Sequence, residues 1–188
     1  MTSDKRIVIG LVGRKGSGKG TVARLIKDRY GATIYRFSDL LRDILDSLYI
    51  DKSRDNLIHL SEILRDGFGQ TILRDAMVKQ VQQDPSRLVV IDGIRRLDDL
   101  SRLDELGDFH LVDVTAPIEL RYERIQQRVE NAGESTDTME QFQATETAPT
   151  EITIADVEAR AQEKIENLGS YDDLATKVDD LVNRIKHA

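Results

Sequence analysis

Four glycines, two lysines and two hydroxyl residues share the nine residues from Gly13 to Thr21. Glycines let the backbone turn sharply, so that successive N–H groups converge on an anion, and a helix starting behind them adds its positive end. A lysine in this setting supplies a mobile cation for the β- and γ-phosphates of a nucleotide. The stretch therefore predicts a phosphate-binding loop for ATP, formed by Gly13, Gly16, Ser17, Gly18, Lys19, Gly20 and Thr21.

The loop departs at one position from the strict phosphate-loop pattern, which has serine or threonine directly after the lysine. Here Gly20 follows Lys19, and the hydroxyl residue Thr21 comes one position later. A flexible surface loop is the alternative interpretation. The apolar run before the loop and the helical pattern after it favour phosphate binding, because nucleotide loops join a buried strand to a helix. We expect the Thr21 hydroxyl to help hold Mg²⁺.

A carboxylate and three arginines have the chemistry that phosphoryl transfer needs, which is charge neutralisation and alignment of two reactants. Asp92 ends a strongly apolar run and could hold Mg²⁺ through water, because this ion keeps several of its waters. Arg42, Arg95 and Arg96 could bind phosphate through paired N–H groups. The alternatives are a strand-ending turn at Asp92 and a solvated helix face at Arg42.

The elements that must position these residues alternate between strand-length apolar runs and longer helical patterns. The pattern predicts strands at 7–12, 33–37, 88–91, 109–114 and, weakly, 164–166. It predicts helices at 21–29, 40–48, 57–64, 71–81, 97–106, from 117, 154–161 and 171–185. This alternation is typical of a doubly wound α/β fold with a five-stranded parallel sheet. Ligands bind beyond the carboxyl ends of such strands, where Gly13, Asp39, Asp92 and Thr115 should lie.

The segment from Asn131 to Thr150 has no periodicity and is rich in Gly, Ser, Thr, Glu and Ala. Its composition predicts a mobile loop. Between Val129 and Ala159 there is no Lys or Arg, whereas Glu130, Glu134, Asp137, Glu140, Glu146, Glu151, Asp156 and Glu158 are acidic. We expect residues 129–152 to form a short lid that closes through Phe142 and the flanking Arg128 and Arg160.

Composition limits the classes of protein to consider. A chain of 188 residues fits one domain, and the net charge of −7 argues against a nucleic-acid partner. The absence of cysteine excludes disulfides, thiolate catalysis and cysteine-bound zinc. No apolar run approaches the length of a membrane span, and the N-terminus has no apolar signal core. We therefore expect a cytoplasmic protein with no membrane partner.

The Gly-Lys-Gly-Thr ending of the loop resembles the adenylate kinases and related P-loop nucleoside monophosphate kinases. Two more stretches are similar to that family, Ser38-Asp39-Leu40-Leu41-Arg42 and Ile91-Asp92-Gly93-Ile94-Arg95-Arg96. The second is closer still to phage-type deoxynucleoside monophosphate kinases and to archaeal dephospho-CoA kinase-like proteins. The resemblance covers most of the fold, although only the phosphate loop is specific by itself. It implies that Asp92 lies near magnesium and that Arg42 and Arg96 hold phosphate.

The resemblance also implies which residues would bind the donor nucleotide and which would bind the acceptor. Arg124 and Arg128, which share a helix face with Arg121, would lie over the donor nucleotide; the alternative is an ordinary salt-bridged surface helix. Residues 38–85 would form a helical insertion that binds the acceptor. The predicted acceptor-binding residues are Asp39, Arg42, Arg65, Arg95 and Arg96, and the predicted catalytic residues are Lys19, Asp92, Arg96 and Arg128.

Three functions fit these residues. The first is ATP-dependent phosphoryl transfer to a nucleoside or deoxynucleoside monophosphate, which needs no general base because the acceptor is already ionised. The second is a kinase for a hydroxyl acceptor such as dephospho-CoA, for which Asp39 is the candidate base. The third is a nucleotide-dependent switch or scaffold with weak ATPase activity, which the acidic lid would favour. The sequence gives neither the base of the acceptor nor the oligomeric state.

Overall fold

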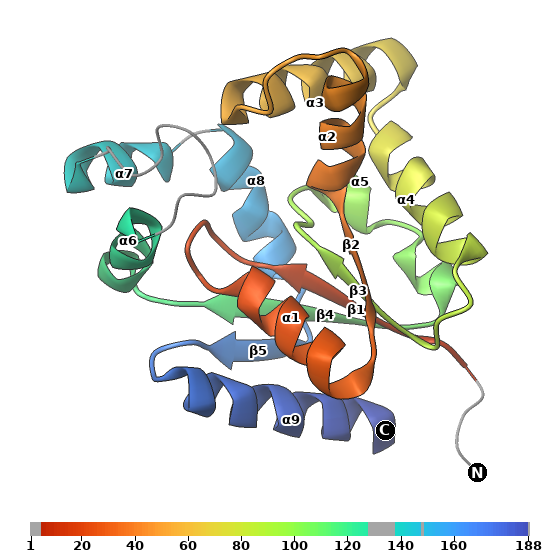
Figure 1. Cartoon of the computed structure of the whole chain (residues 1–188), viewed down its shortest axis with the longest axis vertical. Coiled ribbons are helices and arrows are strands. Elements are labelled where there is room, and N and C mark those ends of the chain that lie inside the picture. Colours follow the sequence, from red (N-terminus) through yellow and green to blue (C-terminus); the bar gives the residue numbers. More distant parts are fainter. Residues whose placement is uncertain (1–4, 128–137, 148, 188) are drawn as a thin grey trace.

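The computed structural model describes residues 5–127, 138–147 and 149–187 and contains a five-stranded parallel sheet at its centre (Figure 1). The strands are β1 (Ile7–Val12), β2 (Thr33–Arg36), β3 (Leu88–Asp92), β4 (Asp108–Thr115) and β5 (Glu163–Glu166). Their order across the sheet is β2-β3-β1-β4-β5, and every neighbouring pair is parallel. The predicted doubly wound α/β fold is confirmed.

Helices cover both faces of the sheet. On one face α1 (Lys19–Tyr30) and α9 (Tyr171–His187) pack against Ile9 and Leu11 of β1. On the other face Val8 and Val12 pack against α2 (Phe37–Ser47), α4 (Ile72–Gln83) and α8 (Pro149–Glu158). Alternate residues of β1 thus enter opposite cores, which explains why the strand is apolar throughout.

The remaining helices surround the carboxyl ends of the strands. They are α3 (Arg54–Phe68), α5 (Leu97–Leu100), α6 (Ile118–Gln126) and α7 (Met139–Thr145), whereas a 3₁₀ turn at Leu103–Leu106 lies just before the start of β4. The predicted helix at 97–106 is therefore divided into a short helix and this turn. Helix α3 spans the top of the molecule above α2 and α8 in Figure 1. In the described part of the chain, no helix has the length and apolar composition needed to cross a bilayer.

The prediction of a loop throughout residues 131–150 is wrong for the described residues of its second half. Helix α7 occupies Met139–Thr145, and α8 begins at Pro149 rather than near Ile154. Thr138 starts α7 with a capping box, in which its hydroxyl accepts a hydrogen bond from the Gln141 N–H and the Gln141 side chain accepts one from the Thr138 N–H. Phe142 anchors the helix, because its side chain is buried against Tyr122 and Arg121.

Register places the candidate chemistry at one edge of the sheet. Strand β1 lies between β3 and β4, with Leu11 opposite Asp92 and Val12 opposite Asp113. The loop that leaves β1 at Gly13 therefore emerges between Asp92, the last residue of β3, and Asp113, which lies two residues before the end of β4. From β1 the chain runs to β2 on the β3 side, whereas from β3 it crosses β1 to reach β4 on the other side. Doubly wound sheets open a crevice for ligands at such a change of direction.

Candidate active site

The phosphate loop joins β1 to α1, and three of its glycines are packed too closely for any other residue. Gly13 has φ +143°, and a Cβ there would lie 2.3 Å from the carbonyl oxygen of Val114. Gly16 has φ +79°, and a Cβ there would lie 2.6 Å from the carbonyl oxygen of Arg121. Gly18 has φ +104°, and its Cβ would lie 2.2 Å from Nδ2 of Asn167. Both the left-handed backbone and the lack of space require glycine. The turn is therefore fixed by contacts with α6 and with the residue that follows β5.

Lys19 folds its side chain back over this loop. Its Nζ donates to the carbonyl oxygen of Gly13 and, at 3.1 Å, to that of Arg14. Thr21 lies in the first turn of α1, where its hydroxyl accepts a hydrogen bond from Arg24 at 3.3 Å. Two carbonyl oxygens thus hold the lysine ammonium over the loop. The oxygens of a phosphate bound in the loop would compete with these carbonyls for the ammonium group.

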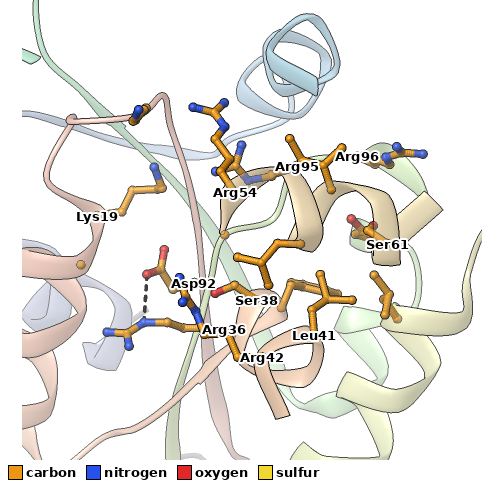
Figure 2. A pocket seen from close by; sticks show the side chains of 18 of the residues that line it. Lys19, Arg36, Ser38, Leu41, Arg42, Arg54, Ser61, Asp92, Arg95 and Arg96 are labelled. Atoms are coloured by element: carbon orange, nitrogen blue, oxygen red, sulfur yellow. Dashed lines mark ion pairs between the residues drawn. The ribbon is translucent and has the colours of Figure 1, made fainter. Parts of the chain in front are cut away.

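Asp92 is the last residue of β3 and has one carboxylate oxygen available for a ligand. Its Oδ2 lies 3.5 Å from Nε of Arg36, an ion pair drawn in Figure 2. Its Oδ1 is buried and has no hydrogen-bond partner among the described residues. A buried carboxylate oxygen normally has a partner, so this atom fits a water of a hydrated Mg²⁺.

One cavity of about 720 Å³ extends from the phosphate loop to helix α3. Figure 2 shows Lys19 and Asp92 on one side and Arg54, Arg95 and Arg96 across from Lys19. The basic residues that line the cavity are Lys15, Lys19, Arg24, Arg36, Arg42, Arg54, Arg65, Arg95 and Arg96. The acidic residues that line it are Glu62, Asp92 and Asp99. A chain with a net charge of −7 thus gathers cations around one cavity that can hold two anionic groups.

Arg65 belongs to the wall of this cavity and is committed to the protein. Its side chain is 4% exposed, and Nη2 donates to Oδ1 of Asp99 at 2.6 Å. Nη1 donates to the carbonyl oxygen of Gln70. Burial raises the pKa of Asp99, although Arg65 acts in the opposite direction. Arg65 therefore joins the end of α3 to α5 and supports the wall of the cavity beside α3.

The acidic segment contacts the phosphate loop through Glu146, which follows α7. Oε1 and Oε2 of Glu146 accept from Nη1 and Nη2 of Arg121 at 2.9 and 2.8 Å. Oε2 also accepts from Nη1 of Arg14, a loop residue, at 2.8 Å. Burial alone raises the pKa of the Glu146 carboxyl, but the hydrogen bonds from Arg121 and Arg14 outweigh it and hold the pKa below its ordinary value.

A second carboxylate of the acidic segment, residues 130–158, contacts arginines at the α3 end of the cavity. Glu151, in the first turn of α8, is 1% exposed. Its Oε1 accepts from Nη2 of Arg54 at 3.3 Å and from Nη1 of Arg95 at 3.1 Å. Two acidic residues of the predicted lid, Glu146 and Glu151, therefore pair with arginines around the cavity.

Arg124 lies behind the phosphate loop rather than in the lining of the cavity. It donates to the carbonyl oxygen of Ser17 at 3.4 Å and to the carbonyl oxygen and Oδ1 of Asn167 at 3.1 and 3.2 Å. Asn167 in turn donates from Nδ2 to the carbonyl oxygen of Ser17 at 2.8 Å. This network connects α6 and the end of β5 to the turn that contains Gly18.

Two more carboxylates lie on the α8 side of β4. Burial raises the pKa of Asp113, and its Oδ1 has no hydrogen-bond partner among the described residues. Burial also raises the pKa of Glu158, with a further contribution from the charge of Asp113. Nε of Arg14 lies 4.0 Å from Oε2 of Glu158.

The structure brings many of the predicted site residues to the cavity. Those that line it are Gly16, Gly18, Lys19, Gly20, Arg42, Arg65, Asp92, Arg95 and Arg96. Gly13, Ser17, Thr21, Asp39 and Arg124 lie near it without lining it. Arg128 is outside the described residues. Four residues at or near the cavity were not predicted from the sequence, namely Arg14, Arg36, Glu146 and Glu151. Their signal is a pairing of charges across more than 50 residues, which the spacing of motifs does not reveal.

Relatives of similar length cover nearly the whole chain. A UPF0200 protein from Hyperthermus butylicus is 26% identical over 185 residues, which are 98% of each chain. A UPF0200 protein from Sulfurisphaera tokodaii is 25% identical over 179 residues, which are 95% of this chain and 97% of its own.

Two solved structures show a similar fold. Shikimate kinase from Bacteroides thetaiotaomicron has a TM-score of 0.64 at 12% identity, over 94% of this chain and 98% of its own. TT1252 from Thermus thermophilus has a TM-score of 0.61 at 21% identity, over 95% and 97%. The fold is therefore that of P-loop kinase-like proteins. The AAA domain family (AAA_17) matches residues 12–143, well over half of the sequence, and the chain belongs to this family.

Proposed function

We propose that this protein transfers the γ-phosphate of ATP to the phosphate of a nucleoside or deoxynucleoside monophosphate. The observation that carries the proposal is the single cavity that connects the phosphate loop to a second group of arginines. ATP would occupy the loop from Gly13 to Thr21, and the acceptor would lie under α3. The acceptor phosphate would be held by Arg42, Arg95 and Arg96.

The positions of the charges support this arrangement. Phosphoryl transfer depends on positioning and on neutralising charge, with little covalent work for the protein. In Figure 2 Lys19 and Asp92 lie across the cavity from Arg54, Arg95 and Arg96, and the transferred phosphate would pass between the two sides. Asp92 and Thr21 would hold Mg²⁺, and the ion, when bound, would neutralise charge on the donor phosphates. The arginines would hold the acceptor in line with the donor.

A hydroxyl acceptor such as dephospho-CoA is the alternative, and it requires a carboxylate base at the acceptor. Asp39 was the predicted base, but among the described residues it does not line the cavity; its neighbour Ser38 does. Asp99 lines the cavity but is paired with Arg65. Asp39 and Asp99 therefore give no support to a general base, and Glu62, which also lines the cavity, is the carboxylate that a hydroxyl acceptor would need.

A switch or scaffold was the third hypothesis, based on the acidic lid. Glu146 and Glu151 pair with arginines around the site, so part of this acidity has an explanation that does not require loss of activity. We therefore favour an active phosphotransferase over a nucleotide-dependent scaffold.

The test is a panel of acceptors with Mg²⁺ and ATP, followed by coupled detection of ADP. The panel contains the nucleoside and deoxynucleoside monophosphates, dephospho-CoA and shikimate. The proposal expects ADP release to be stimulated by at least one monophosphate and the product to be its diphosphate. Stimulation by dephospho-CoA or shikimate alone would favour a hydroxyl kinase. ATP binding without stimulation by any acceptor would favour the scaffold.

A further inference from the structure

Glu151 has a buried carboxylate that pairs with two arginines of the cavity lining, although Glu151 itself does not line the cavity. One oxygen, Oε1, accepts hydrogen bonds from Arg54 and Arg95, which come from the start of α3 and from the chain after β3. The other oxygen, Oε2, is buried without a hydrogen-bond partner among the described residues. A buried charge in this setting needs close counter-charges, and the two guanidiniums supply them.

The two arginines are placed to serve two purposes. A guanidinium carries several N–H groups in a planar fork, and each of these arginines uses only one of them for its hydrogen bond to Glu151. Both side chains line the cavity, with 29% of Arg54 and 46% of Arg95 exposed. Figure 2 shows them close together on the side of the cavity across from Lys19. Their remaining N–H groups can therefore meet a ligand in the cavity while Glu151 fixes them from behind.

Helix α8 is suited to hold this carboxylate firmly. Ile154 and Val157 anchor the helix in the core, with side chains that are 1% and 0% exposed. Glu151 lies in the first turn, where the positive end of a helix favours a carboxylate. A site that must hold an anion within a fraction of an ångström needs such support behind the residues that touch the ligand.

We infer that Glu151 is a positioning residue that orients Arg54 and Arg95 to bind the phosphomonoester of the acceptor. The inference rests on the proposed function and adds Arg54 and Glu151 to its acceptor site. Two guanidiniums and one carboxylate leave a net positive charge facing the cavity. Glu151 does not touch the substrate, and its effect passes through the two arginines.

A competing role makes the opposite prediction. If Glu151 were a stand-in for phosphate that substrate displaces, removing its charge would free the arginines and tighten anion binding. The burial of Glu151 favours positioning, because a ligand in the cavity has no path to its carboxylate while α8 remains packed in the core. The sign of the change in affinity therefore separates the two roles.

The experiment titrates inorganic phosphate into the protein saturated with Mg²⁺ and a non-hydrolysable ATP analogue, so that the phosphate loop is already filled. Binding is followed by the NMR signals of the Nε–H groups of Arg54 and Arg95. In the unsubstituted protein both signals should shift with phosphate. Glu151→Gln should raise the phosphate Kd by about tenfold, the scale seen when residues behind a ligand-binding group are changed. The matched control is Glu140→Gln, an exposed carboxylate of the same acidic segment, which should leave the Kd unchanged.

A further comparison shows whether Glu151 acts through the arginines. In a protein that carries Arg54→Ala and Arg95→Ala, adding Glu151→Gln should change the phosphate Kd no further, whereas a general structural role would give an additional loss. Tighter phosphate binding by Glu151→Gln would overturn the inference, as would unmoved Arg54 and Arg95 signals in the unsubstituted protein. The titration of the unsubstituted protein gives a result even if a variant does not fold. Failure of the proposed function has a different readout, the absence of turnover with every acceptor of the panel.

Discussion

The pairing of Glu146 with Arg121 and Arg14 makes a prediction that does not depend on the substrate. Replacing Glu146 by glutamine keeps the shape of the side chain but removes the charge that compensates two guanidiniums. Arg121 is 6% exposed, so its charge would remain buried without a carboxylate, whereas Arg14 is 32% exposed and can be hydrated. Removing one partner of a buried ion pair costs about 3–5 kcal/mol. Glutamine retains one acceptor oxygen, so we expect about 3 kcal/mol.

Such a loss is large enough to measure by thermal unfolding. In a chain of this size, 1 kcal/mol lowers the melting temperature by about 2–4 °C, so Glu146→Gln should melt about 6–12 °C below the unsubstituted protein at pH 7. Glu140→Gln on the same segment should stay within about 0.5 kcal/mol, because Glu140 is exposed.

The dependence on pH gives an independent check. The pKa of Glu146 lies below its ordinary value of 4.5 in the folded protein, so the stability that the carboxylate contributes is complete above that value. It is lost as the pH falls through the folded pKa, where glutamate becomes neutral like glutamine. Urea unfolding of both proteins from pH 7 downward should show the difference in free energy of unfolding shrinking below about pH 4. An unchanged melting temperature at pH 7, or a difference that persists at low pH, would refute this reasoning.

Four further predictions concern the site and its surroundings. Lys19→Ala should lower phosphoryl transfer by a hundredfold or more, about 3–4 kcal/mol, while the fold remains intact by circular dichroism; near-normal turnover would contradict the phosphate loop. Asp92→Asn should remove most of the magnesium dependence of the rate, and an unchanged Mg²⁺ titration would leave Asp92 as a turn residue. Arg42→Ala should raise the acceptor KM about tenfold or more with little change in the KM for ATP, as initial rates with each substrate varied would show. Hydrogen bonds from Ser86 and Tyr35 lower the pKa of Asp84 to about 2, so Tyr35→Phe should lower the free energy of unfolding by about 1 kcal/mol at pH 7. The difference between the two proteins should shrink from about pH 4 downward, as Asp84 becomes protonated. Urea unfolding at several pH values measures this difference, and a difference that does not change with pH would contradict the role of the Tyr35 hydrogen bond.

The sheet and the phosphate loop could be predicted because their signals are local. Strand β1 is apolar because alternate residues enter two cores, and the glycine spacing after Val12 identifies the turn that follows. Helix α7 also had a local signal that the composition concealed. Thr138 and Gln141 stand three residues apart, the spacing of a capping box, in a stretch otherwise rich in residues typical of loops.

The pairing of the acidic segment could not be predicted in this way. Arg14 and Glu146 are separated by 132 residues, and Arg95 and Glu151 by 56. No periodicity connects such positions, and from the sequence alone the carboxylates belong only to a mobile, acidic lid. Tertiary packing places α8 against the sheet through Ile154 and Val157, and only this packing brings Glu151 to the acceptor arginines.

The close packing around Gly16 and Gly18 affects how the protein must fold. The turn of the phosphate loop is limited by Arg121 and by Asn167, and the bond from Asn167 to Ser17 spans 150 residues. A fragment that ends before β5 would contain the whole nucleotide motif but lack the residue that packs against Gly18. Closing such a distant contact is slow, since a long chain must lose its freedom before the contact forms. Competence to bind nucleotide should therefore appear late in refolding, after the sheet has formed and once the chain beyond Glu166 has docked.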